Sequence, residues 1–102
     1  MTRDADIIRS RAAVRREVAL AAWHAIKAEL EGVGLELTLF GSLAKGGFSA
    51  HSDIDVIVQL GDSGISRSAV DRMVRSVSGD IPVDLFFVED LTQSDLMSLL
   101  ST

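Results

Sequence analysis

The sequence predicts a small α/β (α+β) domain in which a mixed β-sheet is flanked by helices. Apolar residues recur at helical spacing in a long first segment and in a shorter later one, and a capping pattern begins a short final helix. Three short runs rich in β-branched, leucine and phenylalanine residues alternate with these helical segments. Strands interleaved with helices favour one sheet with helices packed on a face, which leaves the other face for function.

The first predicted element is a helix from about Asp6 to Leu30. Gly32 and Gly34 follow it and are expected to end it. Its apolar residues form two neighbouring rows along the helix, which are Ile7, Val14, Val18, Ala21 and Ala25, and Ile8, Ala12, Ala19, Ala22, Ile26 and Leu30. Both rows are expected to contribute apolar surface.

Two strands follow, separated by a short glycine-rich stretch. Residues 35–40 alternate as a half-buried strand should, and Gly41-Ser42 ends this run. Residues 43–52 are small and glycine-rich, which indicates a short helical turn and a loop. Residues 54–60 form the second predicted strand, which is almost continuously apolar.

The remaining elements are a helix, a strand and a final helix. Residues 66–77 show helical spacing, and residues 82–88 form the third apolar run. Thr92 is a good N-cap residue with Asp95 three positions later, so a short helix is expected from about 93 to 100.

Composition limits the classes of function. The 102 residues suit one domain spanning 1–102, and the net charge of -5 disfavours a general grip on nucleic acid. Cysteine is absent, which excludes a disulfide scaffold and thiolate chemistry. The charged start lacks the apolar run of a secretory signal, and no apolar run approaches the roughly 20 residues of a membrane span. We therefore expect a soluble, cytoplasmic protein.

Asp53 and Asp55 form the most informative pattern in the chain. Side chains alternate along a strand, so both carboxylates lie on the same face and repel each other unless a cation lies between them. A divalent cation carrying a nucleoside triphosphate is the usual solution. Asp84 is a third acid within an apolar strand. A solvent-facing edge position would explain each strand acid alone, and Asp53 alone could be a turn residue, but together they favour a shared metal site.

Gly41 and Ser42 supply the second half of the predicted site. Glycine allows the backbone to approach a ligand closely, and the amides of the next turn favour anionic oxygens. Ser42 adds a hydroxyl donor, and Lys45, one turn later, adds a positive charge within reach of a phosphate. A plain strand-to-helix turn is the alternative, but the nearby acids favour a nucleotidyl-transfer site with two metal ions.

Other polar residues carry less weight. His51 borders the site and is interpreted as an exposed loop residue. Arg67, Arg72 and Arg75 share the second predicted helix, where a solvated face is the expected role.

The segments Gly41–Gly46, Ser52–Val58 and Val83–Leu85 closely resemble the polymerase-β-like nucleotidyltransferase superfamily. The short chain looks like its minimal nucleotidyltransferase branch. The resemblance implies Mg²⁺-dependent transfer of a nucleoside monophosphate, with ATP as a donor, to a hydroxyl. It assigns the phosphate-binding turn to Gly41 and Ser42 and the catalytic, metal-binding carboxylates to Asp53, Asp55 and Asp84 (the set already singled out).

The same resemblance suggests a biological role. Many minimal members resemble antitoxins that silence a HEPN-type RNase toxin by adding AMP to a tyrosine. Arg commonly stands in that branch where this chain has Lys45, so the charge is kept but the bidentate phosphate contact is not. The alternatives are a small-molecule nucleotidyltransferase of the antibiotic-modifying kind and a non-catalytic module that binds a nucleotide or a partner.

Overall fold

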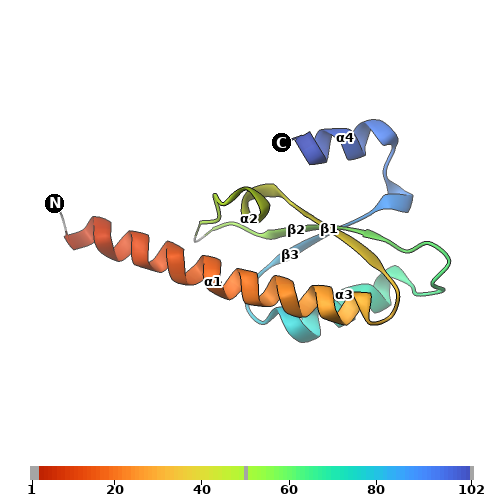
Figure 1. Ribbon diagram of the computed structural model, residues 1–102, viewed down its shortest axis with the longest axis horizontal. Coiled ribbons are helices and arrows are strands. Elements are labelled where there is room, and N and C mark those ends of the chain that lie inside the picture. Colours follow the sequence, from red (N-terminus) through yellow and green to blue (C-terminus); the bar gives the residue numbers. More distant parts are fainter. Residues whose placement is uncertain (1–2, 50, 102) are drawn as a thin grey trace.

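The sheet of the protein has three strands in the order β1-β2-β3 (Figure 1). The computed structural model describes residues 3–49 and 51–101, with side chains from residue 11 onward. Strand β1 (Glu36–Phe40) pairs antiparallel with β2 (Ile54–Gln59), and β2 pairs parallel with β3 (Val83–Phe87). The predicted mixed sheet is confirmed.

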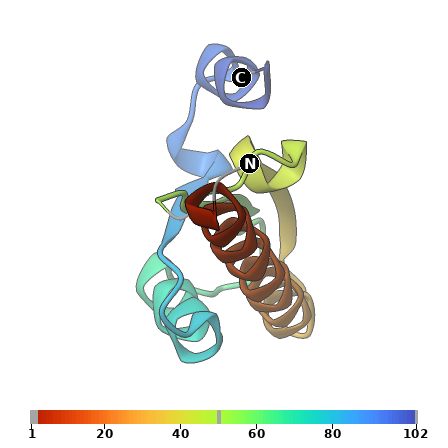
Figure 2. The same ribbon diagram turned by 90° about the vertical axis from the view of Figure 1, so that its left-hand side faces the viewer.

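Helices lie on both sides of this sheet but pack against it unequally (Figure 2). The long α1 (Arg3–Glu31) and α3 (Arg67–Ser78) lie together against one face. The short α2 (Gly41–Lys45) and the C-terminal α4 (Gln93–Ser101) lie on the other side, and α4 contributes no buried residue. The face opposite α1 and α3 is therefore only partly covered.

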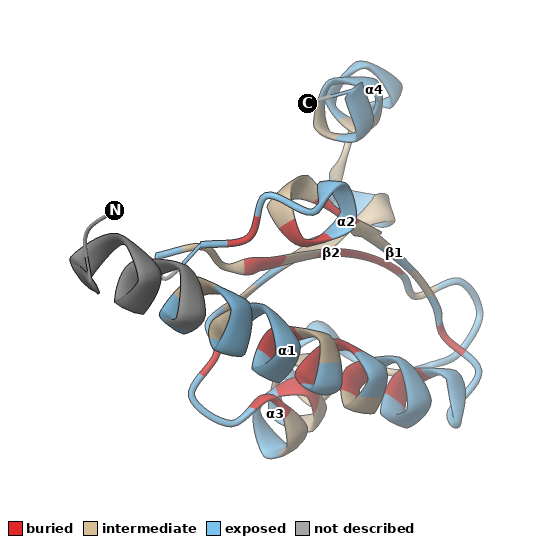
Figure 3. Ribbon diagram, turned by 60° about the vertical axis from the view of Figure 1, so that its left-hand side comes forward, coloured by how far each residue is buried: buried red, intermediate tan, exposed pale blue. Residues whose placement is uncertain are grey.

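The hydrophobic core lies between the sheet and the pair α1 and α3 (Figure 3). Alternation along β2 directs Ile54, Val56 and Val58 into this core, where all three are fully buried. The residue between the first two, Asp55, is directed to the opposite face by the same alternation. The strand thus separates its packing residues from its acid.

Only one of the two predicted apolar rows of α1 is packed in the core. Ala19, Ala22, Ile26 and Leu30 are buried, and Trp23, which belongs to neither row, is buried with them. The other row is largely open to solvent. At about 1.5 Å per residue, a 29-residue helix is about 44 Å long, while a five-residue strand spans only about 17 Å. Much of α1 therefore extends beyond the sheet that could cover it.

The exposed row includes Val14 and Val18, whose exposed fractions are 58% and 50%. Ile7 and Ile8 lie outside the residues whose side chains are described. The apolar surface expected from the two rows is therefore present, and in the described part of α1 one row leaves it open to solvent.

The predicted helix boundaries hold to within a few residues, and their caps explain why. Leu35 N–H donates to the carbonyl of Leu30 at 3.1 Å while Gly34 adopts φ 87°, which ends α1. At the start of α4, Thr92 N–H donates to Asp95 Oδ2 at 3.1 Å, and Asp95 N–H donates to Thr92 Oγ1 at 3.0 Å. This reciprocal pair confirms the predicted N-cap.

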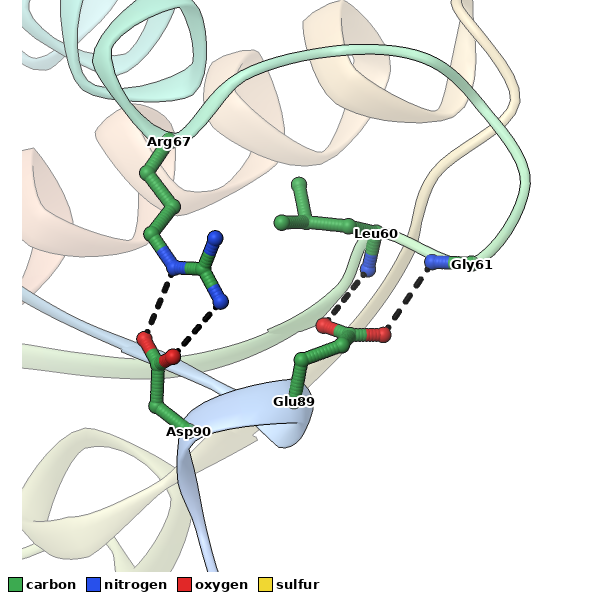
Figure 4. Close-up of polar contacts among 5 residues, drawn as sticks. All are labelled: Leu60, Gly61, Arg67, Glu89 and Asp90. Carbon is green, nitrogen blue, oxygen red and sulfur yellow. Dashed lines mark hydrogen bonds and ion pairs between the residues drawn. The ribbon is translucent and has the colours of Figure 1, made fainter.

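A short 3₁₀ helix, Val88–Asp90, follows β3 and was not predicted. It fastens the ends of β2 and β3 to α3 (Figure 4). Glu89 accepts hydrogen bonds at 3.1 Å from both Leu60 N–H and Gly61 N–H. Arg67 forms a two-point ion pair with Asp90, at 2.8 and 2.6 Å.

Arg67 is exposed, as expected for a solvated face, but it is also held by the ion pair with Asp90. Its guanidinium also lies over the ring of Phe87, with 5.5 Å between the guanidinium carbon and the ring centroid. A residue that pairs with a later 3₁₀ helix and stacks on the end of a strand cannot be recognised from the sequence of its own helix.

Among the described residues, no helix is both long enough and apolar enough to cross a membrane.

Candidate active site

The pairing of β2 with β3 places two acids side by side. Asp55 and Asp84 are direct partners in the parallel register. Asp53 comes immediately before β2, and its carboxyl is near enough to Asp84 to contribute to the raised pKa of that residue. The structure therefore brings together all three acids that the sequence singled out.

The electrostatics of these acids reflect their crowding. Partial burial raises the pKa of Asp55, and the nearby charges of Asp84 and Asp53 raise it further. Burial also raises the pKa of Asp84, followed by the charge of Asp53 and by a hydrogen bond with it. Each shift disfavours the charged form, so the group of acids attracts protons or other cations.

No basic side chain in the described part of the chain forms an ion pair with these acids. Within residues 11–49 and 51–101, the ion pairs are Arg67–Asp90 and Arg75–Asp71, and neither includes one of the three acids. Hard carboxylate oxygens are the ligands that Mg²⁺ prefers, so the donor set fits a divalent cation. In the described part of the chain, the acids are not already arranged as a finished three-ligand cage.

Gly41 begins α2 and lies directly against Asp55. The register of β1 and β2 pairs the preceding residue, Phe40, with Asp55. A Cβ atom built on Gly41 would overlap Oδ2 of Asp55 and lie 3.1 Å from its Cγ. Gly41 also adopts φ 75°, which disfavours other residues. The predicted close approach at this glycine is therefore an approach to a carboxylate.

Ser42 and Lys45 lie on the same short helix. Ser42 is half-buried, and its hydroxyl forms no hydrogen bond within the described structure. Lys45 is exposed at the end of α2 and forms no ion pair with a described acid. The structure thus places both on the element that begins beside Asp55 and leaves their polar groups open to a ligand.

An aromatic pair was missed by the sequence interpretation. Phe40 and Phe86 pack edge to face, with ring centroids 5.5 Å apart and planes at 60°. Phe40 is the register partner of Asp55, and Phe86 follows Asp84 by two residues, so both belong to the face that carries the acids. The alternation of side chains along β3 could have shown that Phe86 shares a face with Asp84. His51 is exposed, as expected.

Comparison with known proteins agrees with this geometry. A family model described as a nucleotidyltransferase domain matches residues 22–97. The match includes the three acids, the Gly41-Ser42 turn and every strand. No curated protein and no solved structure gives a significant match to the chain. Because the family model covers most of the chain, the match supports the resemblance to the polymerase-β-like superfamily. The chain belongs to the nucleotidyltransferase domain family.

Proposed function

We propose that the protein transfers AMP from ATP, in the presence of Mg²⁺, to a hydroxyl group on a partner protein. Family membership supports nucleotidyl transfer in general. The main structural support for the proposal is that Asp53, Asp55 and Asp84 lie together next to the turn at Gly41.

The reaction is a displacement at phosphorus. The acceptor oxygen attacks the α-phosphorus of ATP and forms a new phosphorus–oxygen bond. The bond from the α-phosphorus to the oxygen that bridges to the β-phosphate breaks, and pyrophosphate leaves. The hydroxyl proton passes to the carboxylate of Asp84, which is the register partner of Asp55.

The chain's own residues hold the reactants in position. Asp53 and Asp55 would hold two Mg²⁺ ions, with Asp84 sharing one of them, and Ser42 and Lys45 would contact the triphosphate. When bound, the ions neutralise charge on the attacking and leaving oxygens. Gly41 keeps the backbone close to this cluster without a side chain in the way.

Surface features favour a protein as the acceptor. The face that carries the acids is only partly covered, so a docked macromolecule could close it and exclude water. Exposed apolar side chains are available on two helices, with Val14 and Val18 on α1 and Met97 and Leu100 on α4. A HEPN-type toxin is the partner that we propose, through the resemblance to the minimal branch, and AMP would be added to its tyrosine.

Charge supports this choice of partner. The net charge of -5 suits a basic, RNA-binding protein, because opposite fields speed encounter. The protein would then act as the antitoxin of a toxin–antitoxin pair and would not itself grip nucleic acid.

The test is to incubate the purified protein with radiolabelled ATP and Mg²⁺, with and without the product of its neighbouring gene. Intact mass spectrometry of the partner should show AMP-sized additions that are lost in Asp84→Asn and kept in the exposed-acid control Asp62→Asn. Labelled product without the partner would favour a small-molecule acceptor. ATP binding without any product would leave only a binding module.

A further inference from the structure

Strand β3 forms one free edge of the sheet. Its pairing within the described structure is with β2. Ile54 N–H donates to the carbonyl of Pro82 at 2.9 Å, which fixes the phase of the ladder. In a parallel ladder, alternate residues direct both backbone groups to the same neighbour. The backbone N–H and C=O groups of Asp84 and Phe86 therefore point toward β2. Those of Val83, Leu85 and Phe87 point outward.

A groove runs beside this edge. It has a volume of about 540 Å³ and is lined by residues of β3 and of α3, among them Asp84, Leu85 and Arg72. One end of the groove therefore reaches an acid of the candidate active site. An unpaired strand edge beside an open groove is the arrangement to which an extended peptide adds as a new strand.

We propose that this edge binds the acceptor polypeptide as an extended fourth strand, with its hydroxyl residue opposite Asp84. The inference rests on the proposed transfer to a protein hydroxyl and adds how that acceptor is held. The new strand runs antiparallel to β3.

The direction of the backbone groups along β3 makes the position opposite Asp84 suitable for the acceptor hydroxyl. In an antiparallel pair, residues opposite Leu85 or Val83 would exchange hydrogen bonds with the outward backbone groups. The residue opposite Asp84 would occupy a non-hydrogen-bonded position, where Cα atoms are about 4.5 Å apart and side chains are closest. Its side chain would project onto the face that carries Asp53, Asp55 and Asp84.

The groove also suggests a sequence preference. Residues next to the hydroxyl residue would project toward the opposite face, where α3 lies. Arg67 in this groove is already paired with Asp90. Arg72 is exposed and forms no ion pair among the described residues. An acidic residue beside the hydroxyl residue would therefore find a cation at Arg72.

A second copy of the chain is a poor occupant of this edge. Residues 81–90, which include β3, contain no serine, threonine or tyrosine, and the whole chain contains no tyrosine. Pairing of β3 with itself would bring no acceptor hydroxyl to Asp84. The β3 strand of a second copy is therefore not the acceptor, and the occupant that we propose is a different polypeptide.

Peptides with altered backbones test the edge directly. The probes are nine-residue peptides with a central tyrosine flanked by glutamate, and a binding-only version with phenylalanine at the centre. N-methylation of either residue next to the centre should weaken binding, measured by fluorescence anisotropy, about fivefold or more, because it removes one ladder hydrogen bond. N-methylation of the central residue should leave binding unchanged. Equal effects at all three positions would overturn the inference.

Two protein variants provide a matched pair. Leu85→Pro removes an outward N–H while sparing the groups that bond β2, and Leu85→Val has the same number of side-chain carbons as the proline variant but keeps the N–H. Both should bind ATP, and only Leu85→Pro should lose the peptide. If Leu85→Pro does not fold, amide exchange in the native protein decides, since the Leu85 and Phe87 amides should become protected when peptide binds. Unchanged exchange in the complex would overturn the inference.

A charge reversal tests the preference. With Arg72→Glu, the preference for glutamate over lysine beside the tyrosine should reverse, each preference being about two- to fivefold. Peptide binding without AMP transfer would refute the proposed function and keep the edge site. A folded protein that binds none of the peptides at millimolar concentration, or a dimer whose Leu85 amide is protected without peptide, would refute the edge site alone.

Discussion

The backbone of Gly41 lies against the carboxylate of Asp55, so closely that a Cβ at residue 41 would overlap Oδ2. This contact joins the two halves of the candidate site, the turn after β1 and the acid on β2. Strand pairing creates it, because the residue before the glycine is the register partner of Asp55. The glycine is therefore required for the position of the acid as well as for its own backbone angle.

A comparison of Gly41→Ala with Gly64→Ala separates the effect of the contact with Asp55 from the effect of the backbone angle. The glycines have φ 75° and 73°, but a Cβ at Gly64 would meet nothing within 4 Å. Each variant should lose about 1–2 kcal/mol of stability from the left-handed backbone. Gly41→Ala should lose more than Gly64→Ala in thermal unfolding, and it alone should lose AMP transfer. Equal unfolding and equal activity in the two variants would contradict the contact.

Neutralising Asp55 should abolish transfer without unfolding the protein. The pKa of Asp55 is raised, so its folded state favours the neutral form. That stabilisation is present at low pH and is lost as the pH rises through the folded pKa. At neutral pH and without Mg²⁺, Asp55→Asn should therefore melt at or above the temperature of the native protein.

Mg²⁺ provides the complementary measurement. It should raise the melting temperature of the native protein at neutral pH and of the control Asp62→Asn, but have less effect on Asp55→Asn and Asp53→Asn. Substantial transfer by a folded Asp53→Asn/Asp55→Asn double variant would remove these acids from the proposed mechanism.

Ser42→Ala and Lys45→Ala should weaken ATP binding while leaving the fold intact. Each removes one expected contact with the triphosphate, worth about 1–3 kcal/mol for a charge-assisted hydrogen bond. Isothermal titration calorimetry should show the loss, with the exposed residues Ser94→Ala and Lys27→Ala as matched controls. Unchanged affinity in both variants would place the phosphate contacts elsewhere.

Glu89 gives the fold a distinct pH dependence. Hydrogen bonds from Gly61 N–H and then Leu60 N–H hold its pKa below the ordinary value. A depressed pKa gives stabilisation that is present above the unfolded-state pKa and is lost as the pH falls through the folded one. Glu89→Gln should therefore melt below the native protein at neutral pH, and the gap should close in acid. The exposed control Glu36→Gln should show no such gap.

Much of the local structure was predictable because it depends on neighbouring residues. The cap formed by Thr92 and Asp95 joins residues only three positions apart in the chain, and it appears as predicted. The shared face of Asp53 and Asp55 follows from strand alternation. Two helical segments were identified from their apolar spacing, the last helix from its cap and three strands from their apolar runs, with small errors at their ends.

The sequence by itself determined which residues are chemically unusual. These are the acids within two apolar strands and the glycine directly after the first predicted strand. Tertiary structure alone decided that Asp84 lies opposite Asp55, that Gly41 touches that same carboxylate, and that Arg67 binds Asp90. The reason is physical. Periodicity and capping involve residues close in the chain, whereas strand order, register and the burial of one helix face depend on contacts between distant segments, and only the packed fold selects those.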